Sequence, residues 1–243
     1  MKRRKKLILR MVVLSMSLAS FSTVKSKKAS TGNYLKKTFF ANPADSIYST
    51  MQLDDYGLSK EAFILAVKGW DILKAQGKIV NEEVISIIDF SLPSNKKRLF
   101  VLNLQTMQLL FNTYVAHGKN SGSNIASTFS NKTNSYKSSL GFYVTESVYS
   151  GKHGYSLRLN GEEKGINDHA FQRGIVMHGA SYVNELLANK QGFIGRSQGC
   201  PAIPSAQHKE IIDHIKNGSC LFIYANDKHY LSHSAFLQSD KKV

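Results

Sequence analysis

Acidic residues, cysteines and long apolar runs are scarce in this chain of 243 residues. Asp and Glu number 17 against 32 Lys and Arg, and the net charge of +15 favours an anionic partner such as nucleic acid, anionic lipid or an acidic cell-wall polymer. With only two cysteines, the one disulfide that the chain can form joins Cys200 to Cys220, and it stays open as an alternative to two free thiols. Hydrophobic residues make up 42% of the chain, which suits a packed core and argues against disorder of the whole chain.

The longest apolar stretch lies at the N-terminus, behind a cluster of positive charge. Lys2–Lys6 precede the apolar stretch Leu7–Phe21, which small residues follow. Its uninterrupted part, Met11–Phe21, is well short of the roughly 20 residues that span a bilayer, and the arrangement is typical of a secretory signal peptide. We therefore expect residues 1–24 to be a cleaved signal peptide rather than a retained anchor. The mature protein is then exported, periplasmic or associated with the cell envelope, without an integral membrane span, and nucleic acid is excluded as its partner.

Two segments precede the main domain. Residues 25–41 are polar, basic and without periodicity, and we expect a flexible tether. Residues 42–80 are expected to be helical, because Ser59 is a good N-cap and Gly77 a good terminator. Apolar residues recur between them at helical spacing: Ala62, Phe63, Ala66, Val67, Trp70 and Leu73. Trp70 is accordingly expected in the core rather than as a ligand platform.

From residue 84 onward the chain changes to short runs rich in β-branched and aromatic residues. The strand-like runs are Val84–Phe90, Arg98–Leu104, Gln108–Ala116, Gly141–Val148, Tyr155–Leu159, Gly174–His178 and Ser219–Tyr224. Residues 184–189 and 206–216 read as short helices. The sequence predicts a mainly β fold of the antiparallel type over residues 81–228, followed by a polar tail over residues 229–243.

Cys200 lies in a short segment that favours a sharp, rigid turn. Gly199 before it permits a tight backbone and Pro201 after it fixes φ. A catalytic thiol needs such a presentation, and the backbone N–H groups of Gly199 and Cys200 are candidates for stabilising an oxyanion. We therefore expect Cys200 to be a free nucleophile and Cys220, which precedes an apolar strand, to be a buried thiol.

A nucleophilic thiol needs a nearby base or cation, and His178 is the best placed of the eight histidines. It ends the apolar strand Ile175–Met177, and Gly179 beside it leaves room for the ring. A Cys and a His taken alone are a weak signal, because a lone His is more often structural.

Longer strings add specificity. Ile175–Ala180 is followed, 22 residues after the His, by Cys200 within Arg196–Pro201. Further strings in the same order are Asp89–Ser91, Arg98–Val101, Val115–Gly118, Ser138–Tyr143 and Gly151–Leu157. Together they resemble the murein L,D-transpeptidase catalytic family of YkuD type over roughly residues 84–224.

The resemblance implies a β-sandwich or barrel-like catalytic domain that acts on peptidoglycan stem peptides without a cofactor. The Cys200 thiolate attacks the bond between the L-centre of the third residue and the terminal D-Ala of a tetrapeptide stem. D-Ala leaves, a thioester forms, and an amine of a neighbouring stem gives a 3-3 cross-link. Water in place of the amine gives L,D-carboxypeptidase activity. His178 carries over as the base, with the Gly179 carbonyl orienting its ring.

The chain departs from the commonest family pattern around the nucleophile. Gln198 stands where a second His is usual, and Pro201 begins the pair that replaces the usual Arg or Asn, so the chain is closer to a subgroup with a Ser-x-Gly-Cys-Pro pattern. Ser197 matches the family motif. Arg196 could supply the contact to a substrate carboxylate, or it is a solvated surface residue.

The resemblance also points to three other polar residues, His117, His153 and Tyr155, as substrate contacts in the cleft. The alternative for the two histidines is hydrogen bonding that stabilises a turn, and the alternative for Tyr155 is a place in the core. His229 and His233 have a helical metal-ligand spacing, but we expect a solvated tail and no metal. An inactive wall-binding module is the alternative to an enzyme, with Gln198 as its best support. We expect a monomer.

Overall fold

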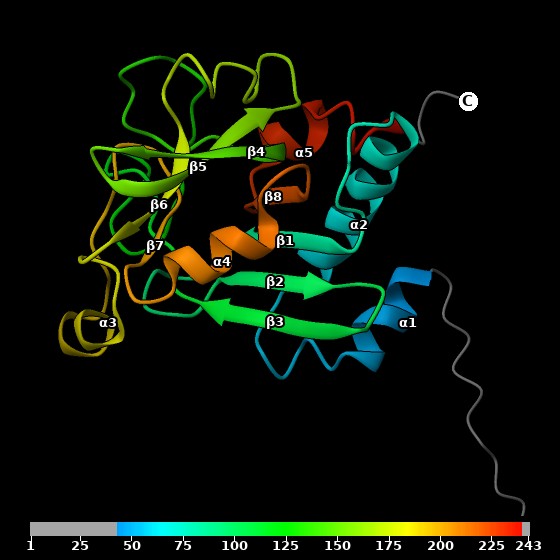
Figure 1. The fold of residues 1–243 in the computed structure, drawn as a ribbon, viewed down its shortest axis with the longest axis horizontal. Coiled ribbons are helices and arrows are strands. Elements are labelled where there is room, and N and C mark those ends of the chain that lie inside the picture. The colour runs from blue at the N-terminus through cyan, green and yellow to red at the C-terminus, as the bar shows by residue number, and fades with distance from the viewer. Residues whose placement is uncertain (1–42, 240–243) are drawn as a thin grey trace, which may run out of the picture. The chain divides into compact units, whose positions relative to one another are not determined.

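Residues 43–239 of the chain are described by a computed structural model (Figure 1). The expected signal peptide (residues 1–24) and tether (residues 25–41) lie outside these described residues. The helices are α1 (Pro43–Thr50), α2 (Lys60–Ala75), α3 (Glu185–Gln191), α4 (His208–Ile215) and α5 (Lys228–His233). The strands are β1 (Val84–Asp89), β2 (Leu99–Asn103), β3 (Gln108–Thr113), β4 (Gly141–Gly151), β5 (Gly154–Gly161), β6 (Val176–Ala180), β7 (Ala202–Pro204) and β8 (Cys220–Tyr224). The expected mainly β fold with short helices is confirmed.

The strands form one sheet in the order β3-β2-β1-β8-β4-β5-β6-β7. The expectation of an antiparallel domain is wrong for two pairs, because β1 lies parallel to β8 and β6 lies parallel to β7. An antiparallel bridge between Ala116, just beyond β3, and Ala202 in β7 joins the two edges. The sheet therefore almost closes into a barrel, which removes most of its open edge.

Helix α2 begins and ends where its sequence signals predict. The Ser59 hydroxyl accepts a hydrogen bond from Ala62 N (3.3 Å), and Gly77 adopts a φ of +68° just beyond the C-terminus. Gly69 faces the sheet, and a Cβ at this position would lie only 2.0 Å from the Phe142 ring. The close approach of helix and sheet thus requires glycine here. Trp70 packs against the core but is only half-buried, with the Lys74 ammonium 5.1 Å from its ring centroid.

The core lies between α2, α4, α5 and the sheet. All six residues of β1 and all five of β8 are buried, as expected for strands in the middle of a sheet that helices cover. Phe142 of β4 stacks on Phe222 of β8 with ring centroids 4.2 Å apart, and on Phe236 at 5.2 Å. This stack connects the sheet to the C-terminal segment of the chain.

The described part of the expected polar tail, residues 229–239, is not solvated throughout. Helix α5 covers its beginning, and Tyr230, Phe236 and Leu237 are buried in the core. The buried carboxylate of Glu163 anchors it, because Glu163 accepts hydrogen bonds from Tyr230 OH (2.9 Å) and the Ser234 hydroxyl. The segment has few apolar residues, so its composition did not predict that these few would be buried.

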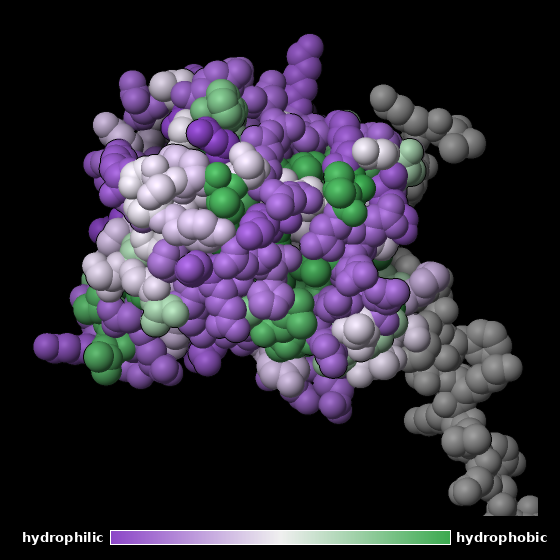
Figure 2. Space-filling view, in the orientation of Figure 1, coloured by the Kyte–Doolittle hydropathy of each residue, from purple (hydrophilic) through white to green (hydrophobic). Residues whose placement is uncertain are grey.

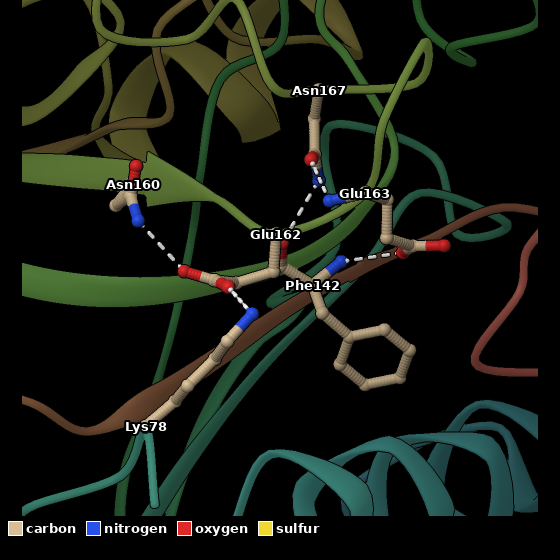
Figure 3. Close-up of polar contacts among 6 residues, drawn as sticks. All are labelled: Lys78, Phe142, Asn160, Glu162, Glu163 and Asn167. Carbon is tan, nitrogen blue, oxygen red and sulfur yellow. Dashed lines mark hydrogen bonds and ion pairs between the residues drawn. The ribbon is translucent and has the colours of Figure 1, made fainter. Parts of the chain in front are cut away.

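The same Glu163 carboxylate also accepts a hydrogen bond from Phe142 N at 2.9 Å (Figure 3). Asn167 makes two hydrogen bonds nearby, each 2.9 Å long. Its side-chain amide donates to Phe142 O, and its side-chain oxygen accepts from Glu163 N. The neighbouring Glu162 instead pairs with Lys78 at 2.6 Å near the surface (Figure 3). Two adjacent carboxylates therefore differ in environment, one closing a buried network and one forming a more exposed ion pair.

The face shown in Figure 2 is largely hydrophilic, with hydrophobic residues scattered in small groups. Within residues 43–239, none of the helices has the length and apolar character needed to span a bilayer.

Candidate active site

Cys200 and His178 line one cavity of about 690 Å³. The cavity lies beside β6 and the turn that precedes β7. Its lining consists of Asn134, Tyr136, Tyr149, Lys152, His153, Arg173, Gly174, Ile175, Val176, His178, Tyr182, Arg196, Ser197, Gln198 and Cys200. The two residues that the sequence singled out for acyl transfer therefore share an accessible space, together with four of the expected substrate contacts.

The turn that carries Cys200 is held by its own side chains and by a neighbouring loop. The Ser197 hydroxyl donates to Cys200 O at 2.6 Å, and Ser197 N donates to His117 O at 2.9 Å. Gly199 has a φ of +123°, and a Cβ here would meet Lys137 O at 2.8 Å. Both the backbone conformation and the lack of space thus require glycine before the nucleophile.

One expected oxyanion donor is already engaged. Gly199 N donates to the Ser197 hydroxyl at 3.0 Å, so the prediction that this N–H would serve the oxyanion is wrong for this conformation. The Ser197 hydroxyl can accept this hydrogen bond from Gly199 N while it donates its own proton to Cys200 O. Burial raises the pKa of the Cys200 thiol, and the backbone N–H groups of Val176 and Cys200 oppose this rise. The Cys200 N–H remains the candidate donor.

His178 is oriented by its neighbour in the chain. Its Nδ1 lies 2.9 Å from Gly179 O, and since a carbonyl oxygen only accepts, Nδ1 carries the proton and Nε2 is left as the basic atom. In the sheet, His178 is paired with Ser156 of β5 on one side and with Ala202 of β7 on the other. This register brings the base next to the strand that begins two residues after Cys200.

Electrostatics favour a neutral pair at rest. Burial is the largest cause that lowers the pKa of His178, the hydrogen bond to Gly179 O opposes it, and the electrostatic interaction with the neighbouring His153 lowers the pKa further. Burial also raises the pKa of the Cys200 thiol, against the opposing effect of Arg173 and Lys152. A neutral thiol, which donates to Gly174 O at 3.7 Å, and a neutral imidazole are therefore the resting forms at neutral pH.

The other expected contacts divide into two groups. His153, on the turn between β4 and β5, stacks on His178 with ring centroids 4.2 Å apart, and it lines the cavity. Arg196, Ser197 and Gln198 line it too. Arg196 is exposed and donates one N–H to Gly122 O at 3.2 Å. These four residues thus line the same cavity as Cys200.

His117 and Tyr155 are not part of the cavity lining. His117 is buried, with Nδ1 accepting from the fully buried Arg98 at 2.7 Å and Nε2 next to Gly122 O at 3.1 Å. Burial, followed by the charge of Arg98, lowers the pKa of His117 to about 4, so it is neutral. Tyr155 OH donates to Asp213 of α4 at 2.6 Å. Both side chains have structural partners: His117 as its alternative interpretation proposed, and Tyr155 through Asp213, although it is only partly buried and not inside the core.

Two cavity cations, Arg173 and Lys152, were not identified as site residues from the sequence. Arg173 belongs to the turn before β6, and Lys152 to the turn between β4 and β5. The only local signal was the position of Arg173 directly before the strand expected at Gly174–His178. What makes it a site residue is its packing against residues 130–139, which a single sequence does not reveal.

The two cysteines are both free, and Cys220 is fully buried in β8. His229 and His233 stack on α5 with ring centroids 4.1 Å apart. Across residues 43–239, no group of three or more His, Cys, Asp or Glu side chains is arranged to hold a metal ion.

Comparison with known proteins gives one family. The family model for the L,D-transpeptidase catalytic domain matches residues 54–224. Curated proteins give no match. Similar solved structures include an L,D-transpeptidase from Mycobacterium smegmatis (13% identity, TM-score 0.38, 59% of this chain and 59% of that one). Others are the helical cell shape determining protein Pgp2 from Campylobacter jejuni (14%, 0.37, 60% and 48%) and Bd1075 from Bdellovibrio bacteriovorus (15%, 0.39, 66% and 55%). This chain therefore spans between 48% and 59% of the length of these proteins.

Proposed function

Because the chain belongs to the family of L,D-transpeptidase catalytic domains, we propose that it is an exported cysteine acyltransferase that cross-links peptidoglycan stem peptides in the cell envelope. The observation that carries the proposal is the shared cavity of Cys200 and His178, in which the Gly179 carbonyl holds the His178 ring with Nε2 as the basic atom. No cofactor is needed for this chemistry, since thiol and imidazole supply nucleophile and base.

The first half-reaction transfers an acyl group to the enzyme. His178 Nε2 takes the proton of the Cys200 thiol as the sulfur attacks the carbonyl carbon that joins the L-centre of the third residue to D-Ala. The C–S bond forms, the oxyanion collapses and the C–N bond breaks. His178 then returns the proton to the departing amine, so that D-Ala leaves neutral at its nitrogen and a thioester remains on Cys200.

The second half-reaction regenerates the thiol. An amine of a neighbouring stem attacks the thioester carbonyl, and its proton passes through His178 to the leaving sulfur. The new amide bond is the 3-3 cross-link. Water attacking in the same way releases a tripeptide stem, which is the carboxypeptidase alternative.

The polar residues of the cavity lining are proposed as substrate contacts. Arg196 uses one of its five N–H groups on Gly122 O, and the planar guanidinium suits a stem carboxylate. His153, Gln198 and the Ser197 backbone complete the wall near the nucleophile. Ser197 contributes chiefly by fixing the turn, since its hydroxyl bonds to Gly199 N and Cys200 O.

The test is product analysis with a purified disaccharide-tetrapeptide. Mass spectrometry after incubation is expected to show released D-Ala and dimers that carry a 3-3 link, both absent with Cys200→Ser. Abundant D-Ala without dimers would assign the carboxypeptidase reaction instead. Neither product from folded wild-type protein would contradict both enzymatic readings and leave an inactive wall-binding module.

A further inference from the structure

Arg173 is a half-buried cation held only by neutral groups. Its guanidinium donates to Ser130 O (2.7 Å), to Lys137 O (2.6 Å) and to the hydroxyls of Ser139 and Ser135. These four acceptors all belong to residues 130–139, which cover one side of the cavity. The contacts fix the direction of the guanidinium plane while leaving its charge uncompensated.

No carboxylate pairs with Arg173 within residues 43–239. The ion pairs of this part of the chain join other residues. Burial lowers the pKa of Arg173, and the groups that act against this are the Tyr143 phenol and the Cys200 thiol, neither of which is a carboxylate. The cavity lining contains no Asp or Glu at all. Partly buried charges in proteins are normally paired, so the structure leaves a positive charge facing the space around the thiol.

The guanidinium lies directly against the nucleophile turn. A Cβ built on Gly199 would be 3.4 Å from one of the Arg173 terminal nitrogens. Gly199 is also the residue whose N–H is occupied by the Ser197 hydroxyl and therefore does not serve an oxyanion. The turn thus has one backbone donor fewer than expected and a fixed cation beside it.

We propose that Arg173 is the electrostatic positioning residue of this active site, stabilising negative charge at the Cys200 turn, first on the thiolate and then on the oxyanion of the tetrahedral intermediate. A charge held in place before the reaction needs no reorganisation as the oxyanion forms, and a partly desolvated site strengthens its effect. The same four hydrogen bonds fix residues 130–139 as a wall of the cavity, which is why the test must separate charge from structure.

The experiment measures the alkylation of Cys200 by iodoacetamide as a function of pH, and needs no peptidoglycan. Its outcome is therefore independent of the proposed transpeptidation. Only one thiol reacts, because Cys220 is fully buried, and Cys200→Ser gives the blank. In Arg173→Gln the pH of half-maximal rate is expected to rise by about one pH unit, since a nearby opposite charge stabilises the ionised form to that extent. Arg173→Lys keeps the positive charge but loses the planar guanidinium, and its pH of half-maximal rate is expected to return most of the way to the wild-type value.

Lys132→Gln is the matched control. It removes one positive charge from the segment that Arg173 contacts, residues 130–139, but Lys132 is exposed and outside the cavity lining, so the alkylation profile of this variant should match wild type. A wild-type profile in folded Arg173→Gln would overturn the proposal, and so would an equal shift in Lys132→Gln. If Arg173→Gln does not fold, the wild-type ratio of rates with anionic iodoacetate and neutral iodoacetamide decides. A ratio at or below that of free glutathione contradicts a positive field at the thiol.

Discussion

The protonation states of two side chains determine how the proposed reaction starts. His178 is neutral because burial lowers its pKa, and Cys200 is a thiol because burial raises its pKa. This differs from a preformed thiolate–imidazolium pair, in which the two pKa values move the opposite way. The proton must then move during the attack, and the acceptor is Nε2, since Nδ1 is bonded to Gly179 O.

The pH dependence of D-Ala release follows from these directions. The basic form of His178 is lost only as the pH falls through its lowered pKa, so kcat/KM should decline on the acid side with a midpoint below about 6.5, the ordinary value for histidine. Alkylation of Cys200 should still be rising at about pH 8.5, the ordinary value for cysteine. Alkylation that is already maximal at neutral pH would indicate the ion pair instead.

Replacing His178 tests its role as the general base. His178→Ala is expected to lower D-Ala release by about 10²- to 10⁴-fold, the usual contribution of a general base, while alkylation of Cys200 at high pH stays near wild type. His214→Ala is the control, because this exposed histidine of α4, whose ring bonds to Glu210 O and packs against Phe111, lies outside the cavity lining. If D-Ala release fell equally in His178→Ala and His214→Ala, the effect of His178 would be on the stability of the fold and not on proton transfer.

At the scale of elements, α5 is anchored by a buried carboxylate. Glu163 accepts from Phe142 N, Tyr230 OH and the Ser234 hydroxyl, and Tyr230 and Ser234 belong to α5 and its C-terminal end. Glu163→Ala should lower the free energy of unfolding by about 2–4 kcal/mol, because it leaves buried donors without an acceptor. Urea unfolding followed by circular dichroism measures this.

Lys78 provides the control for that prediction, on the adjacent ion pair in Figure 3. Lys78→Ala removes the partner of Glu162. The lysine is 44% exposed and the Glu162 side chain 6%, but the Asn160 amide still donates to Glu162 at 2.7 Å, so the cost should stay below that of Glu163→Ala. Glu163→Gln, which keeps the shape, should lie between the two. A cost of Lys78→Ala as large as that of Glu163→Ala would show that the buried network does not anchor α5.

Local sequence patterns predicted those elements whose signals are local. The Ser59 cap, the strands with branched and aromatic residues, and the helices on both sides of the nucleophile are found close to their expected bounds. Strand β7 was missed because it has three residues and ends in Pro204, a residue that disfavours strands. The parallel pairing of β1 with β8 was missed because it joins segments far apart in the chain.

For the site, the nucleophile and the base could be proposed from order and spacing, whereas their surroundings could not. The occupied N–H of Gly199 depends on the rotamer of Ser197, and the exclusion of His117 from the cavity depends on the buried Arg98. Arg173 becomes a site residue only through contacts with residues 130–139. Each of these features arises from packing between distant segments.

At the scale of the whole described chain, the nearly closed sheet puts the site together. The bridge between Ala116 and Ala202 joins its edges next to the nucleophile turn, and the pairing of β6 with β7 places the base beside the strand that follows this turn. The resulting cavity carries Lys152, Arg173 and Arg196 and no carboxylate in its lining, which suits the anionic stem peptides of the proposed reaction.

The most direct test of the central claim is the intact mass of the protein after brief incubation with disaccharide-tetrapeptide and an acid quench. The account predicts an adduct equal to the donor minus D-Ala, located on Cys200 by peptide mapping and absent from Cys200→Ser. Release of D-Ala without any adduct on Cys200, or an adduct that persists in Cys200→Ser, would contradict it.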